Sequence, residues 1–158
     1  NKDGKVDLRD VKKVTQEQAI DVFIKYYFDG PSISGLPQAL QPSVFDMYVN
    51  AGSNAVKILQ RLLGQMGFQV VVDGVLGPQS FAAAVAAYEK APTQMVDAYG
   101  IARRNYYFNL ADRRPPSRKY ARTNSGKKGG WIRRAEEFIT PKYHLSQGEF
   151  QKRVAAWG

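Results

Sequence analysis

The sequence of 158 residues contains no cysteine and a single histidine, His144. Without cysteine the chain has no disulfide framework and no thiolate ligands for a metal. One histidine excludes a histidine-rich zinc site and a serine–histidine triad with a choice of base, so we expect His144 to be a surface or packing residue. We predict neither a metal nor a cofactor.

Long apolar runs are also missing. No stretch is long enough for a membrane span, and no secretory apolar region opens the chain. The chain starts with Asn1 inside a loop-like stretch, and we expect further residues to precede it. The opening NKDGKVDLRD has the spacing of part of a calcium loop, with Asn1, Asp3, Asp7 and Asp10 as ligands, or it is an Asx-rich turn. The turn is the preferred interpretation, because the first ligand of such a loop would lie before Asn1.

Acidic residues are scarce between positions 101 and 134. These positions contain eleven basic residues and one acidic residue, Asp112, so this stretch alone has a net charge of +10, whereas the whole chain has +9. We call residues 103–134, from Arg103 to Arg134, the basic stretch. Such a stretch attracts polyanions, which include nucleic acid, anionic lipid and the acidic polymers of a bacterial envelope.

Helical periodicity dominates what the sequence does contain. A hydrophobic content of 44% and a charged content of 23% are typical of a globular chain of one domain, or of two small ones that share a core. Apolar spacing, N-terminal capping residues and Pro or Gly breaks predict an all-α fold of about six to seven helices with negligible strand. The expected helices cover residues 15–28, 42–51, 53–66, 78–89, 93–110, 131–139 and 146–157, and residues 111–130 are expected to form a basic loop.

One tight turn interrupts this pattern, at VVVDGVLGPQSF, residues 70–81. Asp73-Gly74 is a strong turn signal, because Asp hydrogen-bonds to its own backbone and Gly accepts a positive φ. Gly77-Pro78 then opens a helix, since proline is favoured at the first helical position. We interpret this motif as a structural connection between two helices.

The carboxylates do not suggest a catalytic pair. Hydrolysis of a glycosidic bond uses an acid with a raised pKa and a second carboxylate or a positioned water. Glu136 and Glu137 are adjacent, so on a helix they point about 100° apart. Glu89 and Glu149 lie near helix ends, where we expect them to act as caps or as favourable charges. We expect no glutamate in the chain to be buried beside a partner.

Four segments together resemble one family of bacterial and phage proteins. FDMYVNAGSNAVKILQRLLG (45–64), VDGVLGPQSF (72–81), ARRNYYFNL (102–110) and GGWIRRAEEF (129–138) are similar in order and spacing to the glycoside hydrolase family 108 muramidases, some of which are described as secretion activator proteins. These carry a family 3 peptidoglycan-binding module in their second half. The resemblance implies a lysozyme-like helical fold that cleaves the glycan strand of peptidoglycan, without a cofactor.

The resemblance also implies where the site lies. In that family the general acid is a Glu in an EGGY-like segment, and this sequence contains no EGG, so we expect the acid upstream of Asn1. Residues 1–52 would then be the remainder of the catalytic domain, and residues 53–158 the peptidoglycan-binding module on the same core. The candidate substrate-binding residues are Asp46, Tyr48, Asn50 and Trp131.

Alternatives stay open for these residues. Asp46 is also placed to pair with an arginine, and Asn50 to cap its helix before Gly52. Tyr106 and Tyr107 are further aromatic candidates near the basic stretch, with core packing the stronger interpretation for Tyr106.

Two other functions compete with the muramidase. One is a non-catalytic module that binds peptidoglycan or assists secretion. The other is a nucleic-acid-binding protein, which is disfavoured because no recognition motif accompanies the basic stretch. A muramidase is expected to be made in the bacterial cytoplasm and to act in the periplasm or cell wall, where the basic stretch would attract anionic wall polymers.

Overall fold

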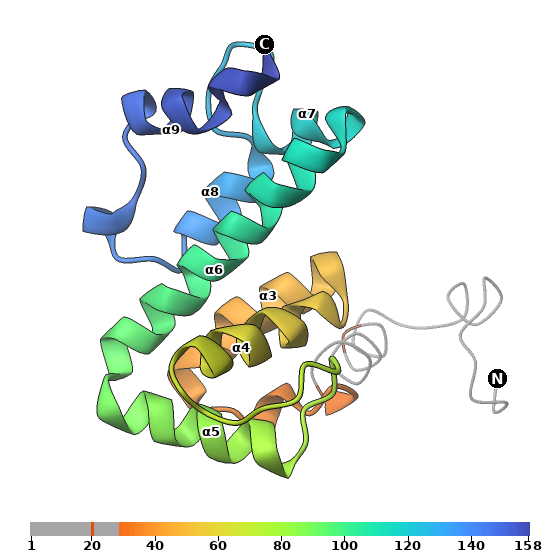
Figure 1. Ribbon diagram of the computed structural model, residues 1–158, viewed down its shortest axis with the longest axis vertical. Coiled ribbons are helices and arrows are strands. Elements are labelled where there is room, and N and C mark those ends of the chain that lie inside the picture. The colour runs from red at the N-terminus through yellow and green to blue at the C-terminus, as the bar shows by residue number, and fades with distance from the viewer. Residues whose placement is uncertain (1–19, 21–28) are drawn as a thin grey trace, which may run out of the picture.

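The computed structural model describes residue 20 and residues 29–158, and it is helical (Figure 1). The predicted helix over residues 15–28 and the possible calcium loop over residues 1–10 lie outside the described residues. The described part of the chain contains no strand and seven α-helices, which confirms the all-α prediction. The helices are α3 (Gln41–Ala51), α4 (Asn54–Gln65), α5 (Pro78–Lys90), α6 (Pro92–Arg113), α7 (Arg118–Ala121), α8 (Gly130–Glu136) and α9 (Gln147–Val154).

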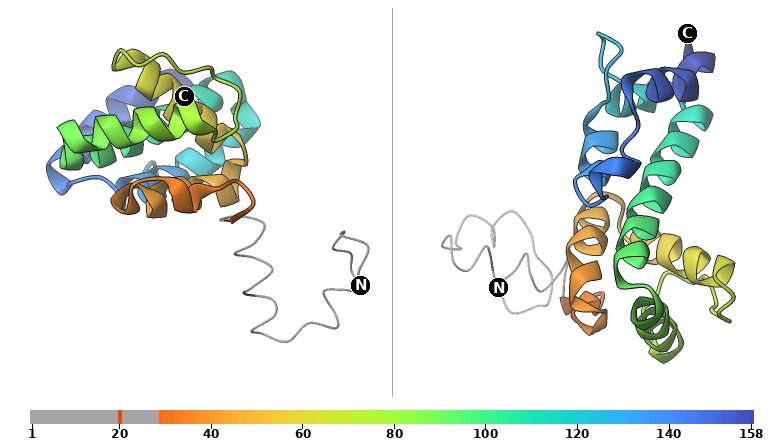
Figure 2. Two further views of the ribbon diagram at one scale, coloured as in Figure 1. Left: turned by 90° about the horizontal axis from the view of Figure 1, so that it is seen from below. Right: turned by 90° about the vertical axis from the view of Figure 1, so that its left-hand side faces the viewer.

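The long helix α6 organises the fold. It packs against α3, α4, α5, α7 and α8. In the right-hand view of Figure 2, α3 and α8 lie to one side of α6 and α4 to the other. Pro92 opens α6 at a position where its missing N–H costs nothing. The helix ends at Arg113 because Pro115 disfavours helical backbone at Arg114.

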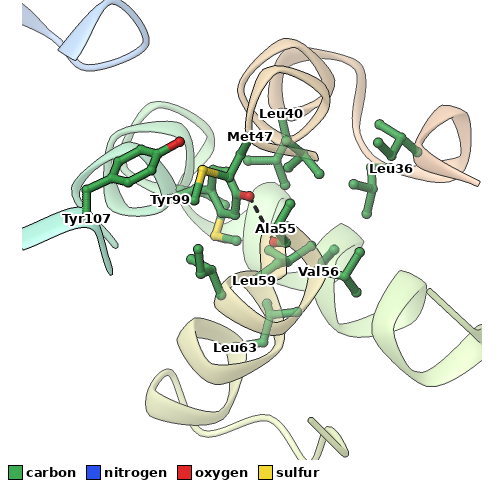
Figure 3. Packing of buried hydrophobic residues seen from close by; sticks show 14 of the residues in the cluster. Leu36, Leu40, Met47, Ala55, Val56, Leu59, Leu63, Tyr99 and Tyr107 are labelled. Carbon is green, nitrogen blue, oxygen red and sulfur yellow. Dashed lines mark hydrogen bonds between the residues drawn. The ribbon is translucent and has the colours of Figure 1, made fainter. Parts of the chain in front are cut away.

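The hydrophobic core lies where α3, α4, α5 and α6 meet (Figure 3). Met47 of α3, Leu59 of α4 and Tyr99 of α6 are each fully buried there. The Tyr99 hydroxyl donates a hydrogen bond to the carbonyl oxygen of Ala55 at 2.9 Å, so its one buried polar group has a partner. Residues on both sides of position 52 therefore share one core, and the division of the chain into two domains at that position stays a prediction.

The turn at residues 73–77 is held by one side chain of α4. The Oε1 atom of Gln60 accepts from the backbone N–H groups of Asp73 and Gly74, at 3.0 and 2.9 Å. Its Nε2 donates to Asp73 Oδ1, Val75 O and Ser80 Oγ, at 2.9, 3.0 and 3.1 Å. Gly74 has φ +78, the left-handed conformation that favours glycine. Within the described residues the motif therefore has the structural role that its turn chemistry predicts.

The predicted loop over residues 111–130 is wrong in part. α6 continues to Arg113, and the loop contains a 3₁₀ turn over Pro115–Ser117 and the short helix α7. Residues 122–128, here called the basic hairpin, then reverse direction, with Thr123 N–H donating to the carbonyl oxygen of Lys127 at 2.9 Å. Apolar spacing did not predict these elements, because a 3₁₀ turn that begins with Pro115 and Pro116 carries no apolar periodicity.

Candidate functional site

The carboxylate of Asp46 lies where α3 meets α6 and α8. Its Oδ2 accepts from Nη2 of Arg103 at 2.6 Å, and its Oδ1 pairs with Nη2 of Arg134. Burial would raise the pKa of Asp46, but the hydrogen bonds from Arg134 and Arg103 together hold that pKa below its usual value. Asp46 is thus an ionised partner of two arginines, and its role as a sugar ligand stays a prediction.

Asn50 follows Asp46 by one helical turn on the same face of α3. Its Nδ2 donates to the hydroxyl oxygen of Tyr107 at 2.5 Å. It does not close the helix, since the C-terminal N–H of Gly52 donates to the carbonyl oxygen of Tyr48 instead. Burial raises the pKa of Tyr107 above its ordinary value, and its protonated phenol keeps a proton to donate.

Three aromatic rings, Tyr107, Trp131 and Tyr120, run from the interior to the surface, and we call them the aromatic ladder. The rings of Tyr107 and Trp131 stack with centroids 4.7 Å apart and planes 19° apart. Trp131 in turn contacts Tyr120 at 5.1 Å, and Tyr120 is 49% exposed. The ladder therefore joins the Asn50–Tyr107 hydrogen bond to a solvent-exposed ring.

The structure brings three of the four predicted substrate-binding residues together. Asp46, Asn50 and Trp131 converge on Arg134 and Tyr107, and we call these five side chains the junction cluster. The fourth, Tyr48, is half-buried against the hydrophobic core and makes no hydrogen bond or ring contact with the cluster among the described residues. Residues 46 and 50 share one helix face, whereas residue 48 lies about 200° from residue 46 around the helix, which explains the separation.

Two arginines of the basic stretch are not on the surface, which corrects the interpretation of that stretch. Arg103 is wholly buried and Arg104 is 6% exposed. Arg103 pairs with Asp46, and Arg104 donates to Glu136 at 2.7 Å. A count of charges along the sequence cannot detect this, because the neutralising carboxylates lie on other helices.

Glu136 corrects a second expectation, since it is a buried glutamate with partners. Besides Arg104, its oxygens accept from Lys128 Nζ at 2.5 Å and from the backbone N–H of Leu145 at 2.8 Å. Burial would raise the pKa of Glu136, but the hydrogen bonds from Lys128, the Leu145 backbone and Arg104 keep it lowered. This carboxylate ties α8 to α6, to the basic hairpin and to the segment before α9, and its role is structural.

Two further properties of the described residues bear on function. No group of three or more His, Asp and Glu side chains in this part of the chain has the arrangement of a metal site. Each helix there is too short or too polar to cross a lipid bilayer.

Comparison with known families shows which family the chain belongs to. Residues 54–137, more than half of the chain, match the family described as Predicted Peptidoglycan domain. The chain belongs to the predicted peptidoglycan domain family. Ahead of the matched predicted peptidoglycan domain, residues 1–52 match the family described as Glycosyl hydrolase 108.

A solved structure, titled "Structure of Brucella abortus SagA", has the same fold as this predicted peptidoglycan domain protein. The two chains are 24% identical, with a TM-score of 0.52 over 85% of this chain and 71% of that chain. The chain has no significant match among curated proteins.

The two matched ranges meet in the junction cluster. Asp46 and Asn50 of α3 lie within the Glycosyl hydrolase 108 match, whereas Tyr107, Trp131 and Arg134 lie within the predicted peptidoglycan domain. The polar contacts across the α3–α6–α8 junction are therefore contacts between these two ranges.

Proposed function

We propose that this protein is a peptidoglycan hydrolase, an N-acetylmuramidase that cleaves the glycan strand of the bacterial cell wall. The observation that carries the proposal is the junction cluster, because one range that matches a glycosyl hydrolase family and another that matches a peptidoglycan family build it together.

The junction cluster has the chemistry that binds amino sugars. The exposed Asn50 amide offers a donor and an acceptor to N-acetyl and hydroxyl groups, and the buried Tyr107 hydroxyl holds that amide in place. The exposed Tyr120 presents an aromatic face, on which the C–H side of a sugar ring stacks, and Trp131 packs against it. Asp46 holds the exposed Arg134 guanidinium in place beside them.

The general acid belongs elsewhere in this proposal. A glycosidase acid keeps its proton at working pH because its pKa is raised. Asp46 and Glu136 have lowered pKa values, and the buried Asp97 accepts two hydrogen bonds from Thr140, through its N–H and its hydroxyl, at 2.7 and 2.8 Å. Following the family resemblance, we place the acid in a glutamate upstream of Asn1, and the site of action in the periplasm or cell wall after export.

The test compares residues 1–158 with a form extended upstream to include the glutamate-bearing segment. Purified peptidoglycan is incubated with each form, and turbidity and the masses of released muropeptides are measured. Products with reducing N-acetylmuramic acid ends from the extended form alone would support both the reaction and the placement of the acid. If neither form cuts and both sediment with the wall, the protein is a binding module and the muramidase proposal fails.

Variants of the extended form test the junction cluster. Trp131→Ala and Asn50→Ala are expected to weaken cleavage by about tenfold each, since each removes one contact of about 1–2 kcal/mol. The control is Tyr143→Ala, which removes an exposed aromatic ring outside the cluster. Equal losses in all three variants would contradict the assignment of the cluster.

Nucleic-acid binding is less well supported than the sequence alone indicates. Arg103 and Arg104 are buried in ion pairs, and Lys128 and Arg134 also pair with carboxylates. What remains exposed of the basic stretch is scattered over the end of α6, α7, the basic hairpin and α8. Binding of anionic wall polymers by these remaining charges stays part of the proposal.

A further inference from the structure

A groove lies between α4 and α6, on a part of α6 that the junction cluster does not use. Its volume is about 660 Å³, within the range of ligand-binding clefts. Apolar side chains of Ile58, Leu62 and Leu110 line it together with Tyr106. Four amide side chains also line it: Asn54, Gln65, Asn105 and Asn109.

The groove is strongly cationic. Arg61 of α4, Arg113 at the end of α6 and Arg114 contribute guanidinium groups, and no acidic side chain lines the groove. Among the described residues none of these three arginines takes part in an ion pair, in contrast to the partnered Arg103, Arg104 and Arg134. Three unneutralised guanidinium groups around one cleft produce a positive potential that favours an anion.

The guanidinium and amide groups together favour one kind of anion. A guanidinium pairs with a carboxylate through two parallel N–H···O bonds. Asparagine and glutamine side chains both donate and accept, which matches the N–H and C=O groups of a peptide backbone. The phosphodiester group itself only accepts hydrogen bonds, so a phosphate polymer matches the amide oxygens of the groove less completely than a peptide does.

We infer that this groove binds the carboxylate-bearing peptide stem of peptidoglycan. The inference rests on the proposed function and names a second part of the same substrate. The geometry agrees, because Tyr106 of the groove and Tyr107 of the aromatic ladder are neighbours on α6, with ring centroids 5.7 Å apart. A glycan strand at the ladder and its peptide branch in the groove would thus contact the same helix, α6, one beside α8 and the other beside α4.

The experiment titrates the protein with soluble probes, using calorimetry for Kd and amide NMR shifts for location. The first probe is a stem tetrapeptide with free carboxylates, L-Ala-D-Glu-diaminopimelate-D-Ala, and the second is the same peptide with its carboxylates converted to amides. The third is a peptide-free amino-sugar oligomer, and the fourth is a glycerol phosphate oligomer. We expect the free peptide to bind, to shift the amides of Asn105, Tyr106 and Asn109, and to bind at least about tenfold more tightly than the amidated peptide.

Paired variants separate the groove from general charge. Arg61→Gln combined with Arg113→Gln is expected to weaken peptide binding by about tenfold or more. Arg133→Gln is the control, because Arg133 is exposed, belongs to the basic stretch and does not line the groove. Thermal melting verifies that each variant folds. The inference would be overturned if Arg133→Gln lowered the peptide affinity as much, per charge removed, as the groove variant does. It would also be overturned if the glycerol phosphate oligomer bound as tightly as the free peptide.

This failure is distinct from failure of the muramidase proposal. If the extended protein cleaves peptidoglycan but does not bind the free peptide, the groove inference is wrong and the proposed function stands. If the peptide binds in the groove but no form cleaves the wall, the groove inference stands for a binding module.

Discussion

Arg103 of α6 donates to Asp46 of α3 at 2.6 Å across 57 residues of sequence. The guanidinium of Arg103 is wholly buried, and it also donates to the carbonyl oxygen of Ser43 at 3.1 Å. A buried guanidinium requires a carboxylate partner, because an unpaired charge in the interior costs several kcal/mol. This ion pair therefore fixes α3 against α6 and positions Asn50, one turn further along α3, beside Tyr107.

Replacing Asp46 by Asn tests this ion pair. We expect Asp46→Asn to lower the free energy of unfolding by about 3 kcal/mol at neutral pH, because Arg103 would stay buried without its counter-charge. Arg134→Gln removes only the exposed partner, which is 61% accessible, and should change stability by less than about 1 kcal/mol. Urea unfolding of the two variants measures the difference, and equal effects would show that Arg103 does not depend on Asp46.

Glu136 and Glu137 form a matched pair for a second test. Glu136 is 4% exposed with three partners, whereas Glu137 is exposed. Glu136→Gln should lower the free energy of unfolding by about 3 kcal/mol, and Glu137→Gln by less than about 0.5 kcal/mol.

The ionisation of Glu136 also predicts how the free energy of unfolding depends on pH. The folded-state pKa of Glu136 lies below its ordinary value of 4.5, so its ionised form stabilises the fold above pH 4.5. That contribution is lost as the pH falls through the lower folded-state pKa. Chemical unfolding measured from pH 7 to pH 3 should therefore show the gap between wild type and Glu136→Gln narrowing only below about pH 4.5. A gap that stays constant to pH 3 would contradict the assigned partners.

The double glycine before Trp131 provides a steric test. A Cβ atom at Gly129 would lie 2.5 Å from the carbonyl oxygen of Tyr120 and 2.8 Å from the nitrogen of Arg122, whereas one at Gly130 would meet nothing within 4 Å. We expect Gly129→Ala to destabilise the protein by about 2–3 kcal/mol, because backbone atoms at the end of α7 and the start of the basic hairpin must move. Gly130→Ala should be neutral or stabilising by up to about 1 kcal/mol, since alanine favours the helix. Melting temperatures in the reverse order would show that the end of α7 does not pack closely on Gly129.

Gln60 provides a test of the turn at residues 73–77. Gln60→Leu removes five hydrogen bonds and leaves the N–H groups of Asp73 and Gly74 without their acceptor. We expect a loss of about 2–3 kcal/mol and faster amide exchange at these two groups. Gln151→Leu, an exposed glutamine on α9, should change stability by less than about 0.5 kcal/mol. Slow exchange at Gly74 in Gln60→Leu would mean that the turn holds without this side chain.

Local chemistry determined much of this protein before any tertiary contact was known. The all-α class follows from helical periodicity and from Pro and Gly at the helix ends, because these act within a few residues. Ser146 and Glu149 form the capping box that their spacing predicts, and Gly74 takes the positive φ that its turn requires. The i, i+4 spacing of Asp46 and Asn50 likewise placed both on one face of α3.

The tertiary structure alone decided which charges are available and which rings meet. The sequence presents Arg103, Arg104 and Arg134 as equal members of one basic stretch, yet all three form ion pairs with Asp46 or Glu136 through contacts between helices. Arg61 lies far from that stretch in sequence, but it joins Arg113 and Arg114 in the α4–α6 groove because α4 packs on α6. Helical periodicity determines the face on which a residue lies, and only the packing of the helices determines what that face meets.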